Sequence, residues 1–269
     1  MVKVIVIGAG GRMGGRIITL GSTTEGIELV GAVESSGHPL VGKDVGEYLG
    51  LGVTGVAVSG ELAPVVGKAD VVIDFSHHNV VVPHLKVTVG AGKATVIGTT
   101  GLTNEERDAV KDLSQTAPVL LAPNMSVGVN VLFKVLADVS RILGDDYDVE
   151  IVEAHHNQKK DAPSGTAVRM AQIIAESLRR DLDAVAVYER KGMIGARPPK
   201  EIGIQTLRAG DIVGEHNVLF GGMGERLEFI HRAHSRDNFA RGALRAAKWI
   251  AGRKPGLYDM QDVLGLKSA

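Results

Sequence analysis

A glycine-rich turn near the start of the chain constrains the fold more than any other feature of the sequence. The apolar run Val2–Ile7 leads directly into Gly8-Ala9-Gly10-Gly11-Arg12-Met13-Gly14, with glycine at every third position where a strand gives way to a helix. Only glycine lets a backbone approach a pyrophosphate closely, and the first amides of the helix, at its positive dipole end, bind phosphate. The turn therefore predicts a Rossmann-type dinucleotide site, with the spacing GxxGxxG instead of the commoner GxGxxG.

An acidic residue follows at the distance that such a site requires. Glu34 ends the next predicted strand, about 20 positions beyond Gly14, where a carboxylate accepts hydrogen bonds from the ribose hydroxyls of adenosine. A ribose 2′-phosphate would be repelled there. Ser35 and Ser36 offer no guanidinium to neutralise it, which leaves Arg12 as the nearest candidate. The alternative interpretation is a tight glycine turn beside a solvated acid.

The first half of the chain repeats an apolar run, a glycine-rich turn and an amphipathic segment, the pattern of parallel strands with crossover helices. The expected strands are Val2–Ile7, Ile27–Val33, Val71–Phe75, Ala94–Ile97 and Val119–Ala122. Thr103 and Glu106 match a capping box at a helix start.

One loop follows each of the last two of these strands, Gly98–Gly101 after Ala94–Ile97 and Ala122–Ser126 after Val119–Leu121. Ligands of open α/β sheets bind at the carboxyl ends of the strands, so we expect these loops to hold the nicotinamide end of a cofactor. An ordinary strand-to-helix connection is the alternative for each loop.

The pattern changes after Pro123. A long helix is expected over Ser126–Leu143 and another over Asn238–Ala251, because both show one apolar face. Between them lie strand-like runs joined by short links, which predict antiparallel neighbours in an open sheet. These runs are Tyr147–Ile151, Ile202–Leu207, Ile212–Phe220 and Arg226–Ala233.

The predicted fold class is therefore α/β, with a Rossmann-type doubly wound parallel sheet and a second α+β domain whose open sheet is mostly antiparallel. We expect a dinucleotide-binding domain over residues 1–125, completed by the C-terminal segment 236–269. Residues 126–235 are expected to form a substrate-binding and oligomerisation domain. Substrate and cofactor would then meet in one cleft to which both halves of the chain contribute.

The densest set of reactive side chains lies in the segment Glu153–Thr166, between a predicted strand and a predicted helix. Either His155 or His156 could donate the proton that reduction of an unsaturated substrate requires, since histidine has a free pKa near neutrality. Adjacent residues of an extended chain face opposite ways, so the two histidines cannot share one role.

The start of the following helix predicts a carboxylate site. Pro163, Ser164 and Thr166 are residues typical of a helix start. The amides of Gly165 and Thr166 and the hydroxyls of Ser164 and Thr166 could bind an anionic substrate, assisted by a cation from Lys159 or Lys160.

Other interpretations of this segment remain open. The histidine pair could be structural, or it could hold a metal, with Glu153 as a third ligand or as a brace for a histidine. Both lysines could lie in a solvated loop, Lys160 more readily than Lys159.

Composition excludes several classes of protein. With 30 basic and 31 acidic residues among 269, no strong field attracts nucleic acid or an anionic membrane, so a small-molecule partner is expected. The absence of cysteine excludes disulfides, cysteine nucleophiles and thiolate metal sites, and suits the cytoplasm. The short apolar run at the N-terminus does not match a signal peptide.

Six segments together resemble the dihydrodipicolinate reductase (4-hydroxy-tetrahydrodipicolinate reductase) family. They are Gly8–Gly14, Gly98–Gly101, Asn124–Asn130, His155–Thr166, His234–Ala240 and Gly256–Leu264. The resemblance covers essentially the whole chain, and the string HHxxKxDAPSGTA is highly specific to the family.

The resemblance implies NAD(P)H-dependent reduction of 4-hydroxy-tetrahydrodipicolinate to tetrahydrodipicolinate in lysine and diaminopimelate biosynthesis, by a homotetramer. We expect no metal in the site. It implies that His155 donates the proton and that Lys159 is a second catalytic cation. His156, Gly165 and Thr166 would bind the dicarboxylate, together with Ser164. The implied cofactor residues are Gly8, Ala9, Gly10, Gly11, Arg12 and Met13, with Glu34 on the ribose, and Gly98, Thr99, Thr100, Ala122, Pro123, Asn124 and Met125 at the nicotinamide.

Two departures bear on the choice of cofactor. Many relatives carry a basic residue where this chain has Ser35, and often another where it has His77. We therefore expect NADH to be used at least as well as NADPH. Three rival functions remain: a dehydrogenase of another small substrate, a non-catalytic nucleotide sensor, and a metal-dependent lyase.

Overall fold

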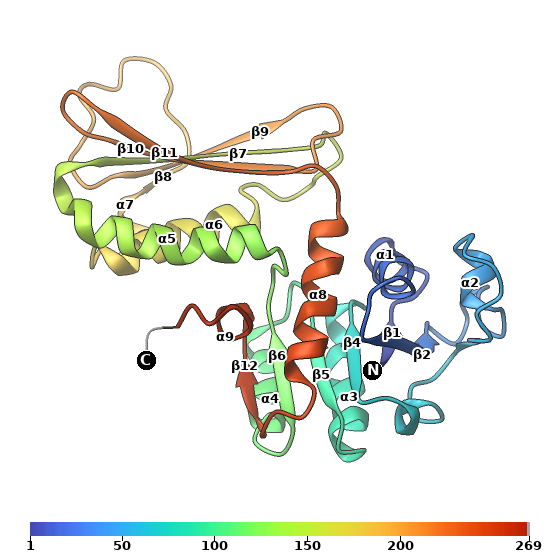
Figure 1. Cartoon of the computed structure of the whole chain (residues 1–269). Coiled ribbons are helices and arrows are strands. Elements are labelled where there is room, and N and C mark those ends of the chain that lie inside the picture. The colour runs from blue at the N-terminus through green and yellow to red at the C-terminus, as the bar shows by residue number, and fades with distance from the viewer. Residues whose placement is uncertain (268–269) are drawn as a thin grey trace. The chain divides into compact units, whose positions relative to one another are not determined.

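The computed structural model describes residues 1–267. The chain forms two compact units, Met1–Val127 together with the segment from Arg236 onward, and Gly128–Ser235 (Figure 1).

The first unit is built on a seven-stranded parallel sheet in the order β12-β6-β5-β4-β1-β2-β3. This confirms the predicted Rossmann-type sheet, with shifts of one residue at the ends of two predicted strands. The strands are β1 (Val2–Ile7), β2 (Ile27–Val33), β3 (Val58–Ser59), β4 (Val71–Asp74), β5 (Ala94–Ile97), β6 (Pro118–Leu121) and β12 (Gly256–Tyr258).

Helices cover both faces of this sheet. One face packs against α1 (Arg12–Gly21), α8 (Asp237–Ile250) and α9 (Met260–Leu264), and the other against α3 (His78–Gly90) and α4 (Asn104–Leu113). Neighbouring residues of β1, such as Val4 and Ile5, therefore lie in separate buried clusters on opposite faces. This double burial explains why the strands are continuous apolar runs in the sequence.

Short elements complete the unit: α2 (Val45–Tyr48) and the 3-10 turn Val66–Lys68. The predicted capping box is present, with the Glu106 amide donating to the Thr103 hydroxyl and the Thr103 amide donating to the Glu106 carboxylate.

The C-terminal segment is integral to the first unit. Strand β12 adds to the edge of the sheet beside β6, and α8 packs along α1. The guanidinium of Arg16 makes two hydrogen bonds, of 2.9 and 2.8 Å, to the Asp237 carboxylate at the start of α8. A bidentate ion pair of this kind fixes the orientation of the start of α8 against α1.

The second unit contains a five-stranded mixed sheet in the order β11-β10-β7-β9-β8. Helices α5 (Val127–Leu143) and α6 (Gly165–Ser177) cover one face of it (Figure 1). The strands are β7 (Asp148–His155), β8 (Ala186–Val187), β9 (Ile202–Arg208), β10 (Gly214–Gly221) and β11 (Arg226–Ala233), and the 3-10 turn Gly144–Asp146 and α7 (Leu182–Val185) complete the unit.

One pairing differs from expectation. The short links predict antiparallel neighbours, and β10 pairs in this way with both β7 and β11. The expected pairing of β9 with β10 is wrong, because β7 lies between them and runs parallel to β9. Crossing one intervening strand spans about 10 Å, which the connecting residues 209–213 can bridge.

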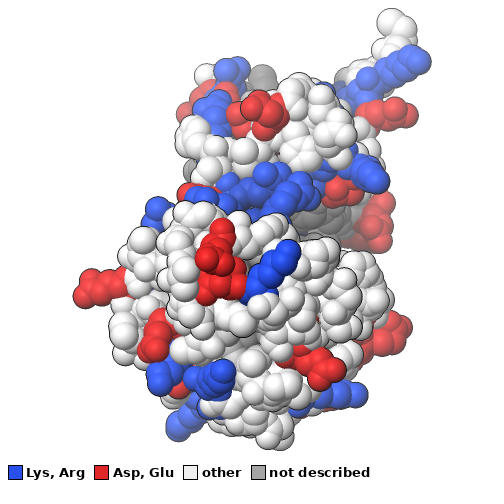
Figure 2. Space-filling view, turned by 90° about the vertical axis from the view of Figure 1, so that its right-hand side faces the viewer, with Lys and Arg blue, Asp and Glu red and all other residues white. Residues whose placement is uncertain are grey.

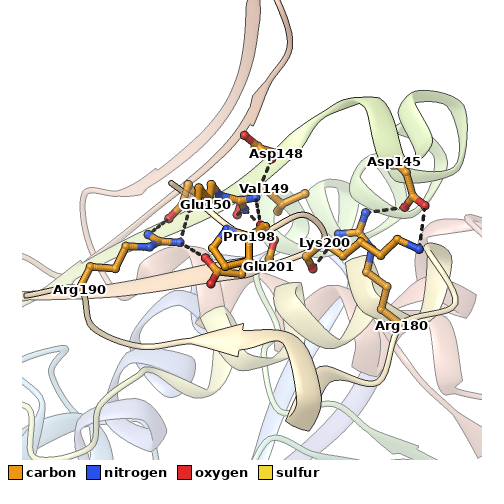
Figure 3. Close-up of polar contacts among 10 residues, drawn as sticks. Asp145, Asp148, Val149, Glu150, Arg180, Arg190, Pro198, Lys200 and Glu201 are labelled. Carbon is orange, nitrogen blue, oxygen red and sulfur yellow. Dashed lines mark hydrogen bonds and ion pairs between the residues drawn. The ribbon is translucent and has the colours of Figure 1, made fainter. Parts of the chain in front are cut away.

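The long connection between β8 and β9 is tied down by ion pairs (Figure 3). Arg190 donates to both Glu150 carboxylate oxygens at 2.9 and 2.8 Å, and to Glu201 at 3.1 Å. Arg197 bonds Glu150 and Asp148. These contacts raise the pKa of Arg190, chiefly through its hydrogen bonds to Glu150.

Figure 2 shows acidic and basic side chains interspersed over the face in view, with wide uncharged areas between them. This distribution agrees with a net charge of −1. Among residues 1–267, no helix combines the length and the apolar character needed to cross a membrane.

We predict that Gly242→Ala destabilises the protein by at least about 2 kcal/mol, because the added methyl group would overlap the Met125 carbonyl on which α8 rests. Gly90→Ala is the matched control, since its methyl group would lie in open space at the end of α3. The control should change stability by less than about 1 kcal/mol. Urea unfolding of both variants measures the difference, and equal midpoints would contradict the packing argument.

Candidate functional site

The glycines of the first turn are required by close backbone contacts. Gly8 has φ of +81°, and a Cβ there would lie 2.7 Å from the Phe75 carbonyl oxygen. A Cβ on Gly14 would overlap the Gly8 carbonyl. The Gly11 amide closes the turn by donating to the Gly8 carbonyl at 3.0 Å. Side chains are thus excluded at Gly8 and Gly14, within the segment in which the sequence predicts close approach of a pyrophosphate.

Helix α1 begins directly after this turn. Gly11 is its N-cap and supplies no side-chain hydrogen bond. The amides of the first helical turn, which begins at Arg12 and Met13, have no carbonyl partner within a helix. They can therefore bind an anion, while the Arg12 side chain is exposed.

Glu34 lies against the same turn. Its carboxylate accepts hydrogen bonds from the Gly10 amide at 3.0 Å and from the Ser35 amide at 2.9 Å. A second contact joins the turn to β2, because the Ala9 amide donates to the Val33 carbonyl at the end of that strand. The structure thus brings the predicted phosphate turn and the predicted ribose ligand together within one unit.

His38, which no sequence motif singles out, also lies in this region. A Cβ on Gly10 would lie 2.8 Å from the His38 ring, so the imidazole packs on the glycine turn. The ring borders a cavity of about 600 Å³, lined by His38, Pro39, Leu40, Gly42, Lys43, Asp44, Glu47 and Tyr48. No strand or helix pattern marks this loop, and no signal in the sequence predicts the contact of His38 with Gly10.

The two loops expected at the nicotinamide follow neighbouring strands, β5 and β6, at the carboxyl edge of the first sheet. A Cβ on Gly98 would overlap the outer end of the Phe75 ring, so only glycine fits there. Thr99 is buried and its hydroxyl reaches the carbonyls of Asp74 and Ser76. Thr100 is exposed at the surface of the loop.

In the second loop, Ala122 and Met125 are buried and Pro123 is exposed. The Asn124 side chain accepts a hydrogen bond from the Ser126 amide at 2.9 Å. The Ala122 amide donates to the Ile97 carbonyl, which fixes this loop against the end of β5. All seven of the residues expected near the nicotinamide therefore lie at one sheet edge.

The second candidate site is produced by the register of the second sheet. Inward-facing residues of its four longer strands form rows across the sheet. Two rows are dominated by apolar side chains that pack on α5 and α6. The next row is Thr206, Glu153, His216 and His231, and the one after it is Arg208, His155, Gly214 and Ala233. The inner face thus changes from apolar to polar along the strands.

Glu153 is the centre of the polar rows, and its side chain is fully buried. Its carboxylate accepts hydrogen bonds from the Arg208 guanidinium, the Ser164 amide, the Thr206 hydroxyl and His155. Burial alone raises the pKa of a carboxyl, but the bonds from His155, Arg208 and Ser164 outweigh it and lower the pKa of Glu153 to about 2. The group is therefore a carboxylate at neutral pH.

Glu153 orients His155. The His155 Nδ1 atom lies 2.6 Å from a Glu153 oxygen, so it carries a proton toward the carboxylate. The other ring nitrogen, Nε2, faces Gly214, where a Cβ would come within 3.0 Å of it. A carboxylate-bound imidazole of this kind can exchange a proton with a ligand through Nε2.

Helix α6 begins beside this pair. Ser164 is its N-cap, and its hydroxyl accepts from the Ala167 amide at 3.2 Å. Gly165 is exposed in the first helical turn, and Thr166 follows it. The helix start therefore carries the amides and hydroxyls from which the sequence predicts a carboxylate site.

The structure distinguishes the two lysines. The Lys159 ammonium group lies 2.9 Å from the Asp161 carboxylate, whereas Lys160 is exposed. The turn that carries them is closed by the Lys159 amide, which donates to the His156 carbonyl. Lys159 is therefore held close to the start of α6.

Sequence reasoning missed four residues of this site: Thr206, Arg208, Gly214 and His216. His216 left a signal, because it is the one polar side chain among the inward positions His216, Val218 and Phe220 of β10. Arg208 left none, because its pairing with Glu153 depends on the parallel register of β7 and β9.

His216 is buried and sits edge-on to His155, with 5.3 Å between the ring centroids. Burial, and then the nearby charges of His155 and His231, lower the pKa of His216 to about 3. Burial also lowers the pKa of His231. Within residues 1–267, no cluster of three or more His, Cys, Asp or Glu side chains is arranged to hold a metal ion.

Comparisons with known proteins cover the whole chain. Family models described as the N-terminus and the C-terminus of dihydrodipicolinate reductase match residues 2–125 and 128–264. The 4-hydroxy-tetrahydrodipicolinate reductase of Syntrophus aciditrophicus is 58% identical over 268 residues, which is 100% of both chains. That of Geotalea uraniireducens is 60% identical over 267 residues, or 99% of this chain and 100% of the relative.

A solved structure agrees with these relatives. The dipicolinate-bound dihydrodipicolinate reductase from Paenisporosarcina sp. TG-14 is 27% identical and superposes with a TM-score of 0.79, covering 97% of this chain and 98% of that one. With both halves matched by its models, and relatives near 60% identity over the full length, the chain belongs to the dihydrodipicolinate reductase family.

Proposed function

We propose that this protein reduces 4-hydroxy-tetrahydrodipicolinate to tetrahydrodipicolinate, with NAD(P)H as the hydride donor and release of water. The observation that carries the proposal is the buried Glu153–His155 pair beside the start of α6. It combines a proton-exchanging nitrogen with donors for a carboxylate, which are the groups that reduction of an anionic unsaturated ring requires.

The dicarboxylate substrate would bind at the start of α6. The amides of Gly165 and Thr166 and the hydroxyls of Ser164 and Thr166 would donate to one carboxylate, with His156 beside them. The ammonium group of Lys159, now 2.9 Å from Asp161, would exchange this partner for the substrate. That exchange is feasible because Asp161 is largely exposed to solvent.

His155 would complete the reaction as the proton donor. The 4-hydroxy substrate would first lose its hydroxyl group and a ring proton as water, which gives the unsaturated dihydrodipicolinate ring. Hydride from NAD(P)H would then add to this ring and leave an enamine or carbanion, which must gain a proton at carbon. Protonated His155 would give that proton from Nε2 while Glu153 stabilises the positive charge on the ring through Nδ1. The relative from Paenisporosarcina supports this site type, since its structure is described as dipicolinate-bound.

The cofactor would bind to the first unit. The residues there fit a dinucleotide, because Gly8 and Gly14 leave no room for side chains and α1 starts without a side-chain cap. Arg12 and Met13 would supply amides to the pyrophosphate, Glu34 would accept from the ribose hydroxyls, and the Gly98–Thr100 and Ala122–Met125 loops would flank the nicotinamide.

The preferred cofactor is NADH, or NADH and NADPH alike. The Glu34 carboxylate is fixed at the turn by two amides, and the next residue, Ser35, is uncharged. Two basic side chains lie at that turn. Arg12 is part of the turn, and the His38 ring packs on Gly10. A 2′-phosphate would therefore meet a carboxylate without a guanidinium from position 35.

The two units would have separate roles, dinucleotide binding for residues 1–125 with 236–269 and substrate binding with oligomerisation for residues 126–235. We expect a homotetramer assembled through the sheet of the second unit. The lack of cysteine is compatible with action in the cytoplasm.

Turnover tests the proposal directly. The purified chain should oxidise NADH when 4-hydroxy-tetrahydrodipicolinate is generated in the same solution, and it should not do so with amino acids or semialdehydes. Turnover should survive a chelator. Binding of NADH without turnover of this substrate would favour a nucleotide sensor and would overturn the proposal.

We predict that His155→Gln and Lys159→Ala lower kcat by roughly 10²- to 10⁴-fold, because they remove the proton donor and a cation at the reacting substrate. Lys160→Ala is the matched control and should stay within about twofold, since Lys160 is exposed. Steady-state and single-turnover rates measure the effect. Unchanged single-turnover chemistry in both variants would remove the assigned roles.

We predict that the wild-type ratio of kcat/KM for NADH to that for NADPH is one or greater. Ser35→Arg should shift this ratio toward NADPH by roughly tenfold or more, because a guanidinium beside Glu34 would pair with the 2′-phosphate. Thr116→Arg adds the same charge just before the start of β6, at the amino ends of the strands, whereas Glu34 follows the carboxyl end of β2. It should leave the ratio unchanged. A strong NADPH preference in the wild type would count against the proposal.

We predict that Glu153→Gln destabilises the protein at neutral pH, because it leaves the partly buried Arg208 without its carboxylate. The pKa of Glu153 is lowered from 4.5 to about 2 in the folded chain, so its charge stabilises the fold fully above about pH 4.5. The difference in unfolding free energy between wild type and variant should therefore be constant above that pH and shrink as the pH falls toward 2. A difference independent of pH in urea titrations would contradict this assignment.

A further inference from the structure

His216 has one hydrogen-bonded ring nitrogen and one that has no partner. Its Nε2 atom lies 3.1 Å from the Ser164 hydroxyl oxygen. Its Nδ1 atom is buried and has no hydrogen-bond partner among the residues that the structure describes. The side chain is 4% exposed. Such a ring must hold its proton on one nitrogen or the other, and the choice determines what Ser164 can do.

The surroundings keep this imidazole neutral. His155 and Glu153 face it from β7, His231 faces it from β11 across the register, and Lys159 adds a positive charge from the turn before α6. Burial is the largest effect, and three of these four groups oppose a further positive charge. The ring therefore has a single N–H.

The position of that N–H follows from the cost of unpaired groups. With the proton on Nδ1, a buried donor would have no acceptor. With the proton on Nε2, His216 donates to Ser164, and Nδ1 is left as a buried acceptor. Buried donors without partners are rarer than acceptors without partners, so the proton belongs on Nε2.

This tautomer fixes the polarity of Ser164. The Ser164 oxygen already accepts from the Ala167 amide at 3.2 Å, so a second bond from His216 fills both of its lone pairs. The hydroxyl can then only donate. Its hydrogen then points away from both partners. It can therefore donate to an anion bound by the first amides of α6.

We propose that His216 is a positioning residue that fixes the Ser164 hydroxyl as a donor to a carboxylate of the substrate. This role rests on the proposed function, which supplies the dicarboxylate. It differs from that of His155, because His216 has no proton to exchange with the ligand and acts only through Ser164. A hydroxyl that is already turned toward the anion needs no reorientation on binding.

The tautomer can be measured without any ligand. Nitrogen-15 NMR of the full chain, with histidine labelled in the ring, should show His216 neutral at pH 7 with its proton on Nε2. Assignment follows from loss of the signal in His216→Gln. A proton on Nδ1, or a charged ring, would overturn the inference, whatever the protein catalyses.

The role can be measured with pyridine-2,6-dicarboxylate, an unreactive dicarboxylate. His216→Leu should weaken its binding by roughly tenfold. His216→Gln should restore binding to within about twofold of wild type, because the Gln side-chain amide can donate from a similar position. NADH binding should be unchanged in both variants, and circular dichroism spectra that match the wild type would show that the second unit also folds.

A double-mutant cycle separates positioning from simple packing. In a Ser164→Ala background, His216→Leu should cause no further loss of dicarboxylate affinity. An equal loss in both backgrounds, or no loss in the single variant, would overturn the role. Failure of the wild-type chain to bind the dicarboxylate would instead overturn the proposed function, while the NMR result would still decide the direction of the hydrogen bond.

Discussion

The buried carboxylate of Glu153 is the constraint on which the second unit depends. A charge removed from water is stable only when donors surround it, and here they come from β7, β9 and the start of α6. By collecting them, Glu153 sets the tautomer of His155, the position of Arg208 and the place at which α6 begins. The hydrogen bonds that make the buried Glu153 charge stable are therefore the same ones that position His155 and the start of α6.

The register of the second sheet places these polar side chains beside the apolar core without interrupting the strands. Side chains of a strand alternate between faces, so one face carries the packing against α5 and α6 and then, two residues further on, the polar rows. Glu153 and His155 continue the alternation begun by Val149 and Ile151. A rigid apolar sheet thus holds reactive side chains that would be mobile on a loop.

The first unit follows a different rule. Its candidate residues follow the carboxyl ends of parallel strands, which all meet at one edge of the sheet. Backbone contact is the main constraint there, as at Gly8 and Gly14, and the predicted ligand contacts include one carboxylate, that of Glu34. Such a surface suits a ligand bound largely through amides, whereas the second unit presents charged and titratable groups.

Local signals in the sequence were sufficient to predict the elements and the classes of site. Continuous apolar runs, a glycine turn and the capping box at Thr103 are local signals, and they predicted the parallel sheet, the position of Glu34 and the reactive segment from His155 to Thr166. Which strands pair became clear from the tertiary structure alone. The structure places β7 between β9 and β10, so the expected pairing of β9 with β10 was wrong. It also decided that Arg208, Gly214 and His216 surround His155, and that His38 rests on Gly10. The physical reason is that local propensity acts over a few residues, whereas register and burial join positions 40 or more residues apart, on which spacing along the chain carries no information.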